Sequence, residues 1–207
     1  CALHCGAQVD FVDIDPCTYN MSEERLAEKL AQAEKNGKLP KIVMPVHMCG
    51  QSCDMAAIYA LSQKYGFKII EDASHAIGGK YKNEPVGNCR FSDISVFSFH
   101  PVKIVTTGEG GMALTNDPEL ADRMQRYRSH GIISDTSRMQ PRPADEIWNY
   151  QQIILGFNYR MTDIHAALGL SQMNRLDEFV TKRQQIVERY NDELSGLALQ
   201  IPCQHTD

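Results

Sequence analysis

Residues 41–72 read KIVMPVHMCGQSCDMAAIYALSQKYGFKIIED, and the fold class is predicted mainly from this stretch. The run KIVMPV is short and rich in β-branched side chains, which predicts a buried strand. Residues 54–66 predict a helix that Asp54 caps and Gly66 ends. FKIIE, residues 67–71, predicts the next strand. Strand, helix and strand in this order are typical of a parallel βαβ unit.

The flanking segments extend this alternation. QVDFVDID (residues 8–15) predicts a strand in which apolar side chains alternate with acids, and Ser22 opens a predicted helix that runs to about Asn36. DISVFSF (93–99) and GMALTN (111–116) predict two more strands with no full helix between them. We therefore expect an α/β fold with a mixed, mostly parallel sheet flanked by helices.

The second half of the chain has a mainly helical pattern. Pro118 at a first helical position predicts a helix that runs to about His130. Residues 132–150 are polar, contain two prolines and show no clear period, which predicts a long loop that is functional or forms an interface. From Thr162 an apolar helical spacing holds to Gly196, which predicts one long helix that connects to a further part of the protein.

The composition argues against several partners. The formal net charge of the 207 residues is -5 and the pI is about 5.8, so we expect neither nucleic acid nor an anionic membrane as a partner. No apolar run approaches the roughly 20 residues that span a bilayer, and no charged and then apolar leader opens the chain. A cytoplasmic protein is the default expectation. Because the chain starts at Cys1 and stops after a long predicted helix, we expect it to be a piece of a longer protein.

The seven cysteines are spread through apparent strands and helices, which predicts reduced thiols rather than a disulfide framework. Two C-x3-C pairs with a nearby histidine leave a zinc site open as an alternative: His4 accompanies Cys1 and Cys5, and His47 accompanies Cys49 and Cys53. Structural zinc usually takes shorter pairs on turns, so we expect buried ordinary cysteines and no metal.

Reactive side chains gather where two predicted strands end. They are Glu71, Asp72 and His75 after one strand, and Ser98, His100 and Lys103 after the other. Ligands of open α/β sheets sit outside the carboxyl ends of the strands. The glycine run TTGEGG matches neither the phosphate loop of NTPases nor the dinucleotide fingerprint. An amine and a carboxylate at one rim suit pyridoxal 5'-phosphate (PLP), because Lys103 could form a Schiff base with it and Asp72 could keep its ring nitrogen protonated.

Three segments carry a resemblance to a known family. EDASHAIGG (71–79), SFHPVKIVTTGEGG (98–111) and GFNYRMTDIHAALGLSQ (156–172) resemble, in this order, the signature segments of the DegT/StrS-type sugar aminotransferases. CALHCGAQVDFVDIDPCTYNMS (1–22) and PVHMCGQSCDMAAI (45–58) resemble the same family. The resemblance covers essentially the whole chain and implies the large domain of a fold-type I, aspartate aminotransferase-like, PLP-dependent transferase.

The resemblance also implies roles for the strand-end residues. Lys103 would be the Schiff-base lysine and would move the proton between the cofactor carbon and the substrate carbon. Asp72 would pair with the pyridine nitrogen, and Ser98 would bind the phosphate. His75 would lie near the phenolic oxygen of the cofactor, with a satisfied turn histidine as the alternative.

Two further residues are implicated by the same resemblance. Asn158 would reach the phosphate of the neighbouring subunit's cofactor, which implies a homodimer with shared active sites. Arg160 would bind an anionic substrate, although an arginine before a helix is as often a structural ion-pair partner.

The resemblance finally implies substrates and domains. SFHPVK followed by TTGEGG looks most like the 4-aminotransferases that use glutamate to aminate a UDP-linked 4-keto-6-deoxy-N-acetylhexosamine in the synthesis of pseudaminic acid, a bacterial surface sugar. Residues 1–160 would belong to the large domain without its N-terminal portion, 161–196 would form a connecting helix, and 197–207 would begin a small domain. Another nucleotide-linked keto sugar, or a PLP-binding regulator without catalysis, remains an alternative.

Overall fold

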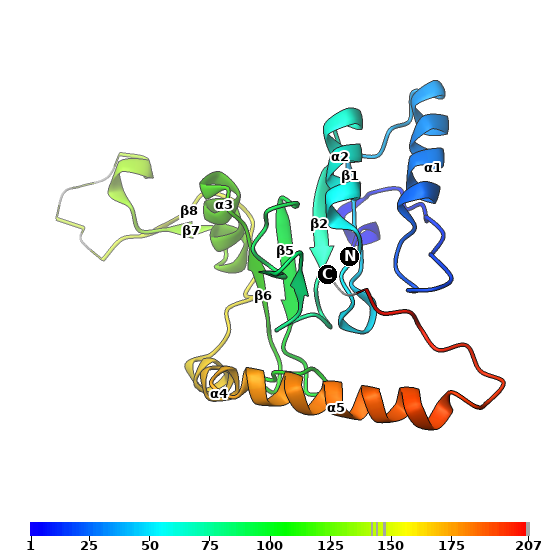
Figure 1. The fold of residues 1–207 in the computed structure, drawn as a ribbon. Helices are drawn as coiled ribbons and strands as arrows, with labels where there is room; N and C mark the ends of the chain where they lie inside the picture. Colours follow the sequence, from blue (N-terminus) through cyan, green and yellow to red (C-terminus); the bar gives the residue numbers. More distant parts are fainter. Residues whose placement is uncertain (142, 144, 147, 206–207) are drawn as a thin grey trace.

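A computed structural model describes residues 1–207 except 142, 144, 147, 206 and 207 (Figure 1). Its centre is a four-stranded sheet in the order β1-β2-β5-β6. The pairs β1–β2 and β2–β5 are parallel and the pair β5–β6 is antiparallel, so the expected mixed, mostly parallel sheet is confirmed. The described strands are β1 (Ile42–Val43), β2 (Lys68–Asp72), β3 (Lys80–Tyr81), β4 (Glu84–Pro85), β5 (Ile94–Ser98), β6 (Gly111–Leu114), β7 (Ile132–Ile133) and β8 (Gln151–Gln152).

Side chains cap the helices where the sequence predicts. The α-helices are α1 (Glu23–Lys35), α2 (Met55–Tyr65), α3 (Pro118–Arg128), α4 (Asp163–Met173) and α5 (Leu176–Leu194), and the short 3-10 helices are η1 (Leu3–Cys5), η2 (Met48–Gly50) and η3 (Thr136–Arg138). Ser22, Asp54, Asp117 and Thr162 each accept a backbone N–H bond from the first turn of α1, α2, α3 and α4 respectively. Such caps satisfy donors that a helix start leaves unpaired.

The core lies in two clusters. One fills the space between the sheet and the helices α1 and α2, which stand side by side in Figure 1. Its buried members are Leu26, Leu30, Val43, Cys53, Met55, Ile58, Phe67 and Ile69. The second cluster lies near the carboxyl ends of β2 and β5 and includes Ala73, Ala76, Ile77, Phe97, Phe99 and Val105. Met161 and Leu176 pack against the second cluster, so the chain around α4 and α5 borders the ends of the strands.

Two predicted strands are wrong in extent. Residues 8–15 form only an isolated bridge, between Ile14 and Met21, and Phe11 is 80% exposed. The Asp10 and Asp13 carboxylates accept bonds from the next backbone N–H, so the segment satisfies its backbone locally. The strand predicted over 41–46 is shortened to β1, because Pro45 has no N–H to donate.

The single helix predicted from Thr162 to Gly196 is also wrong, because two helices occupy this stretch. The bond from Arg175 N–H to the Gln172 carbonyl tightens the end of α4. The backbone of Arg175 then leaves helical geometry (φ -114, ψ 9) before α5 begins. Asparagine at position 174 favours such an end, since its side chain competes for backbone bonds.

The loop predicted over 132–150 contains two short regular elements, β7 and η3. Its first residues form β7, which pairs antiparallel with β8 and makes the base of an arm that projects from the sheet in Figure 1. Positions 142, 144 and 147 of this loop lie outside the described residues.

The prediction that the cysteines are reduced is wrong for one pair. Cys17 and Cys203 form a disulfide, with their Cα atoms 5.1 Å apart, and the Cys203 N–H donates to the Cys17 carbonyl. The other cysteines are free. The partners are 186 positions apart in the sequence, so no spacing motif could reveal them.

None of the described helices combines the length and the apolar character that crossing a bilayer requires.

Candidate active site

The strand register brings Asp72 and Ser98 to the same face of the sheet. Asp72, the last residue of β2, pairs with Val96 of β5, and Ser98 lies two residues further along β5. Side chains two apart on a strand share a face, and residues paired in a ladder share it too. Both are half-buried, whereas Ile69 and Glu71 on the opposite face are buried. A carboxylate and a hydroxyl therefore stand at the carboxyl edge of neighbouring parallel strands.

Asp72 is firmly held by its backbone. Its N–H donates to the Pro45 carbonyl at 2.9 Å and its carbonyl accepts from the His47 N–H at 3.0 Å. One carboxylate oxygen accepts the Ser74 N–H at 3.1 Å. The second oxygen keeps its capacity to accept a proton donor.

Lys103 lies in the turn that follows β5. Its N–H donates to the His100 carbonyl at 2.9 Å, and the Ser98 hydroxyl accepts a long bond of 3.4 Å from the His100 N–H. The Lys103 side chain is half-buried, and within the described residues its amine has no hydrogen-bond or ion-pair partner. A sheltered amine without a counter-ion is available for chemistry.

His75 is already engaged with the chain. Its Nδ1 accepts the Cys49 N–H at 3.3 Å, which ties the loop after β2 to the turn after β1. This bond fixes the neutral ring with its proton on Nε2. Nδ1 therefore serves the turn, as the turn-histidine interpretation expects, while Nε2 has no acceptor among the described residues.

Asn158 and Arg160 lie on a different segment, between β8 and α4. Both are exposed, and in the part of the chain that the structure describes neither side chain bonds to Asp72 or Lys103. Backbone bonds hold Asn158 in place: the neighbouring N–H groups of Phe157 and Tyr159 donate to carbonyls at the end of α3, at 2.6 and 2.9 Å. Asn158 is thus presented outward from a fixed backbone.

Gly131 should be indispensable for the backbone conformation that holds Asn158 outward. Its φ is +71, and a Cβ added there would lie 1.9 Å from the Ile154 carbonyl oxygen. We expect Gly131→Ala to lower the free energy of unfolding by about 3 kcal/mol, through left-handed backbone strain and overpacking. Denaturant unfolding measures this loss. Gly196→Ala is the matched control, because nothing lies within 4 Å of its Cβ; equal stability of the two variants would contradict the prediction.

A buried polar network was missed by the sequence interpretation. His47 Nε2 lies 2.8 Å from Glu71 Oε2, the Ser92 hydroxyl contacts the other carboxylate oxygen, and the Cys53 N–H donates to His47 Nδ1 at 3.2 Å. The signal available was Glu71 itself, since a carboxylate within a buried strand needs a partner. The histidine that supplies it could not be identified from spacing.

The described residues give no support to the alternative of a zinc site. Among them, no group of three or more His, Cys, Asp or Glu side chains is arranged to hold a metal ion. His47, its central histidine, binds Glu71 and the Cys53 N–H instead.

Comparison with known proteins places the chain in a class. Residues 1–207 match the DegT/DnrJ/EryC1/StrS aminotransferase family, and the chain belongs to this family. It is 38% identical, over 93% of its length and 47% of the relative, to the UDP-4-amino-4,6-dideoxy-N-acetyl-beta-L-altrosamine transaminase of Campylobacter jejuni. It is also 38% identical, over 98% of its length and 49% of the relative, to the GDP-perosamine synthase of Caulobacter vibrioides.

Solved structures agree with the family. The aminotransferase PseC of Helicobacter pylori, involved in pseudoaminic acid biosynthesis, superposes with a TM-score of 0.82 at 30% identity, over 95% of this chain and 48% of PseC. Spr1654 of Streptococcus pneumoniae, named as a sugar aminotransferase and solved in a PLP form, gives 0.76 at 28% identity, over 94% of this chain and 50% of Spr1654. The fold-type I expectation is confirmed. The chain spans about half the length of the relatives it matches.

Proposed function

We propose that the protein is a PLP-dependent aminotransferase that moves an amino group from glutamate to a nucleotide-linked keto sugar. The single observation that carries the proposal is the pairing of Asp72 with Val96. It sets a carboxylate beside the strand that leads to Ser98 and to Lys103, whose amine has no partner among the described residues. The family supports the reaction class.

The residues present fit PLP by their chemistry. Within the part of the chain that the structure describes, Asp72 has a carboxylate oxygen without a partner, the Ser98 hydroxyl can still donate, and the Lys103 amine is unpaired. These three groups match the ring nitrogen, the phosphate and the aldehyde of the cofactor, respectively. When bound, PLP supplies an aldehyde for amines to condense with and a ring that accepts electrons.

Each side chain then has a defined task. Asp72 holds the proton on the ring nitrogen through its negative charge, because an adjacent carboxylate favours the protonated, charged form. Lys103 takes a proton from the substrate carbon and returns it to the cofactor carbon, and it reverses this order when the keto sugar receives the nitrogen. Ser98 donates to the phosphate, and His75 Nε2 donates to the phenolic oxygen. Arg160 is proposed to bind an anionic group of the substrate.

A homodimer with shared sites is part of the proposal. The segment around Asn158 exposes large apolar side chains: Leu155 (87%), Phe157 (55%), Tyr159 (73%) and Ile164 (82%). The rings of Phe157 and Tyr159 stack with centroids 4.8 Å apart. Contiguous exposed apolar surface marks interaction sites. A second copy packed there would bring Asn158 to its partner's cofactor phosphate.

The domain arrangement follows the same reasoning. Residues 1–160 are proposed as part of the large domain, the pair α4 and α5 as its connection, and 197–207 as the start of a small domain, although 206 and 207 lie outside the described residues. Because glutamate and nucleotide-linked sugars are cytoplasmic metabolites, the proposed location is the cytoplasm.

For the acceptor we propose a UDP-linked 4-keto-6-deoxy-N-acetylhexosamine, as used for pseudaminic acid-type surface sugars. The Campylobacter relative and PseC support this choice. A GDP-linked keto sugar is the second candidate, because the GDP-perosamine synthase of Caulobacter vibrioides is as identical to this chain as the Campylobacter transaminase is.

A substrate comparison tests the function. The full-length protein, PLP and glutamate are mixed with one of two substrates, and 2-oxoglutarate is measured. The substrates are the UDP-linked 4-keto sugar and the GDP-linked keto sugar that amination would convert into GDP-perosamine. We expect product with the UDP sugar at the higher kcat/KM. A preference for the GDP-linked sugar would show that the proposed UDP-linked acceptor is wrong. PLP binding without product from either sugar would support a regulator without catalysis.

A further inference from the structure

A buried, hydrogen-bonded pair lies behind β2, where Glu71 points to the face opposite to Asp72. Glu71 is 5% exposed and His47 is fully buried, and their side chains meet at 2.8 Å. Because the Cys53 N–H donates to His47 Nδ1, the ring proton of neutral His47 is on Nε2 and is donated to Glu71. Ser92 occupies the other oxygen of Glu71. A buried polar or charged group without a partner is costly, so each of these side chains depends on the others for its hydrogen bonds.

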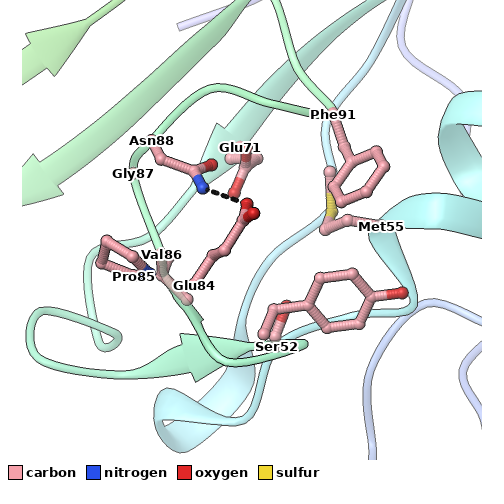
Figure 2. A pocket seen from close by; sticks show the side chains of 10 residues that line it. Ser52, Met55, Glu71, Glu84, Pro85, Val86, Gly87, Asn88 and Phe91 are labelled. Atoms are coloured by element: carbon pink, nitrogen blue, oxygen red, sulfur yellow. Dashed lines mark hydrogen bonds between the residues drawn. The ribbon is translucent and has the colours of Figure 1, made fainter. Parts of the chain in front are cut away.

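The surroundings of Glu71 leave no room for a substrate. Figure 2 shows Glu71 in a cavity that is also lined by Glu84 and Asn88, which bond to one another at 2.9 Å. The cavity holds about 20 Å³, which is room for about one water molecule. Neither Glu71 nor His47 has a task in the reaction described above. We therefore ask which part of the backbone their interaction fixes in place.

His47 sits in the turn that contacts the cofactor-facing residues. Its N–H donates to the Asp72 carbonyl at 3.0 Å, and two residues later the Cys49 N–H donates to His75 Nδ1 at 3.3 Å. Cys49 has a φ of +55, which is an unfavourable conformation for a residue with a side chain. A turn of this kind persists only where its neighbours fix it, and the His47 side chain is its buried anchor.

We propose that the His47–Glu71 pair is a positioning element: by anchoring the turn of residues 46–49 to the back of β2, it holds Asp72 and His75 in place for the cofactor. The inference rests on the proposed function. His47 and Glu71 touch neither cofactor nor substrate and act through the two residues they position. Small displacements of positioned groups cost binding and rate, so the pair should be visible in cofactor affinity.

Two amide variants test the anchor in the full-length protein. His47→Asn can still accept the Cys53 N–H but is too short to reach Glu71, whereas His47→Gln is one methylene longer and can donate to it. We expect His47→Asn to raise the Kd for pyridoxal 5'-phosphate about tenfold or more and to shift the visible absorption band of the bound cofactor. His47→Gln should restore most of both. Ser62→Ala is the control, because among the described residues this buried hydroxyl bonds only to Tyr59 and Gln63 of α2 and lies outside the anchor.

Cys53 gives a readout without cofactor. Burial raises the pKa of its thiol to about 12, so it should resist alkylation at pH 8 in the wild type. A loosened turn in His47→Asn should let iodoacetamide modify Cys53, as peptide mass spectrometry would record.

The outcomes separate the two proposals. Wild-type protein that takes up no PLP would overturn the proposed function, and the positioning role with it. If the wild type binds PLP and a folded His47→Asn variant shows the same Kd and spectrum, the positioning role is wrong while the function stands. If His47→Asn fails to fold while His47→Gln behaves like the wild type, the pair contributes to stability alone. That result would also overturn the inference.

Discussion

Lys103→Ala in the full-length protein should remove essentially all transaminase turnover. The variant has no amine to take the proton from the substrate carbon, and proton transfer by a positioned group contributes about 10²–10⁴-fold in rate. Loss of the covalent role adds to this, so we expect kcat to fall by about four orders of magnitude or more. The measurement is 2-oxoglutarate formed from glutamate in the presence of the keto sugar.

The fold should survive this substitution. The Lys103 side chain makes no hydrogen bond or ion pair with the described residues, and the bond from its N–H to the His100 carbonyl is kept in alanine. Thermal unfolding should therefore match the wild type. Lys41→Ala, at an exposed lysine before β1, is the matched control and should keep full activity. Turnover that is undiminished in Lys103→Ala would refute the assignment.

Asp72→Asn should leave the fold intact and still cut the rate by about three orders of magnitude. The amide keeps an oxygen that can accept the Ser74 N–H, and the two backbone bonds to Pro45 and His47 are unaffected. A neutral side chain cannot favour a protonated ring nitrogen, so the ring loses its capacity to accept electrons. Steady-state kcat with thermal unfolding measures both halves of this prediction.

The control for this variant is Asp192→Asn, at an exposed carboxylate near the end of α5. It makes the same change of charge far from the strand ends and should leave kcat unchanged. A rate for Asp72→Asn within a few-fold of the control would remove Asp72 from its role.

The βαβ unit and its edge could be predicted because local signals agree there. Asp54 and Gly66 delimit α2 by cap chemistry, and the β-branched run before Asp72 defines β2. Strand alternation then places Asp72 and Ser98 on one face, once the register is known. Nothing in the sequence states the register itself, which depends on packing of the whole sheet.

Other features depend on contacts between distant segments and gave weaker signals. Residues 8–15 have a strand-like pattern but no partner strand, and a pattern alone cannot supply one. The hairpin of β3 and β4 turns through Lys82 and Asn83, both at positive φ, without the glycine that usually marks such a turn. The His47–Glu71 pair joins residues 24 positions apart through packing, which a spacing rule does not encode.

Reductive trapping tests the central claim, that Lys103 and Asp72 hold PLP between them, most directly. The full-length protein is loaded with pyridoxal 5'-phosphate, reduced with borohydride and digested, and the modified peptide is identified by mass spectrometry. We expect a yellow protein whose cofactor becomes attached to Lys103, with weaker loading in Asp72→Asn. Stoichiometric attachment to another lysine, or none at all, would contradict it.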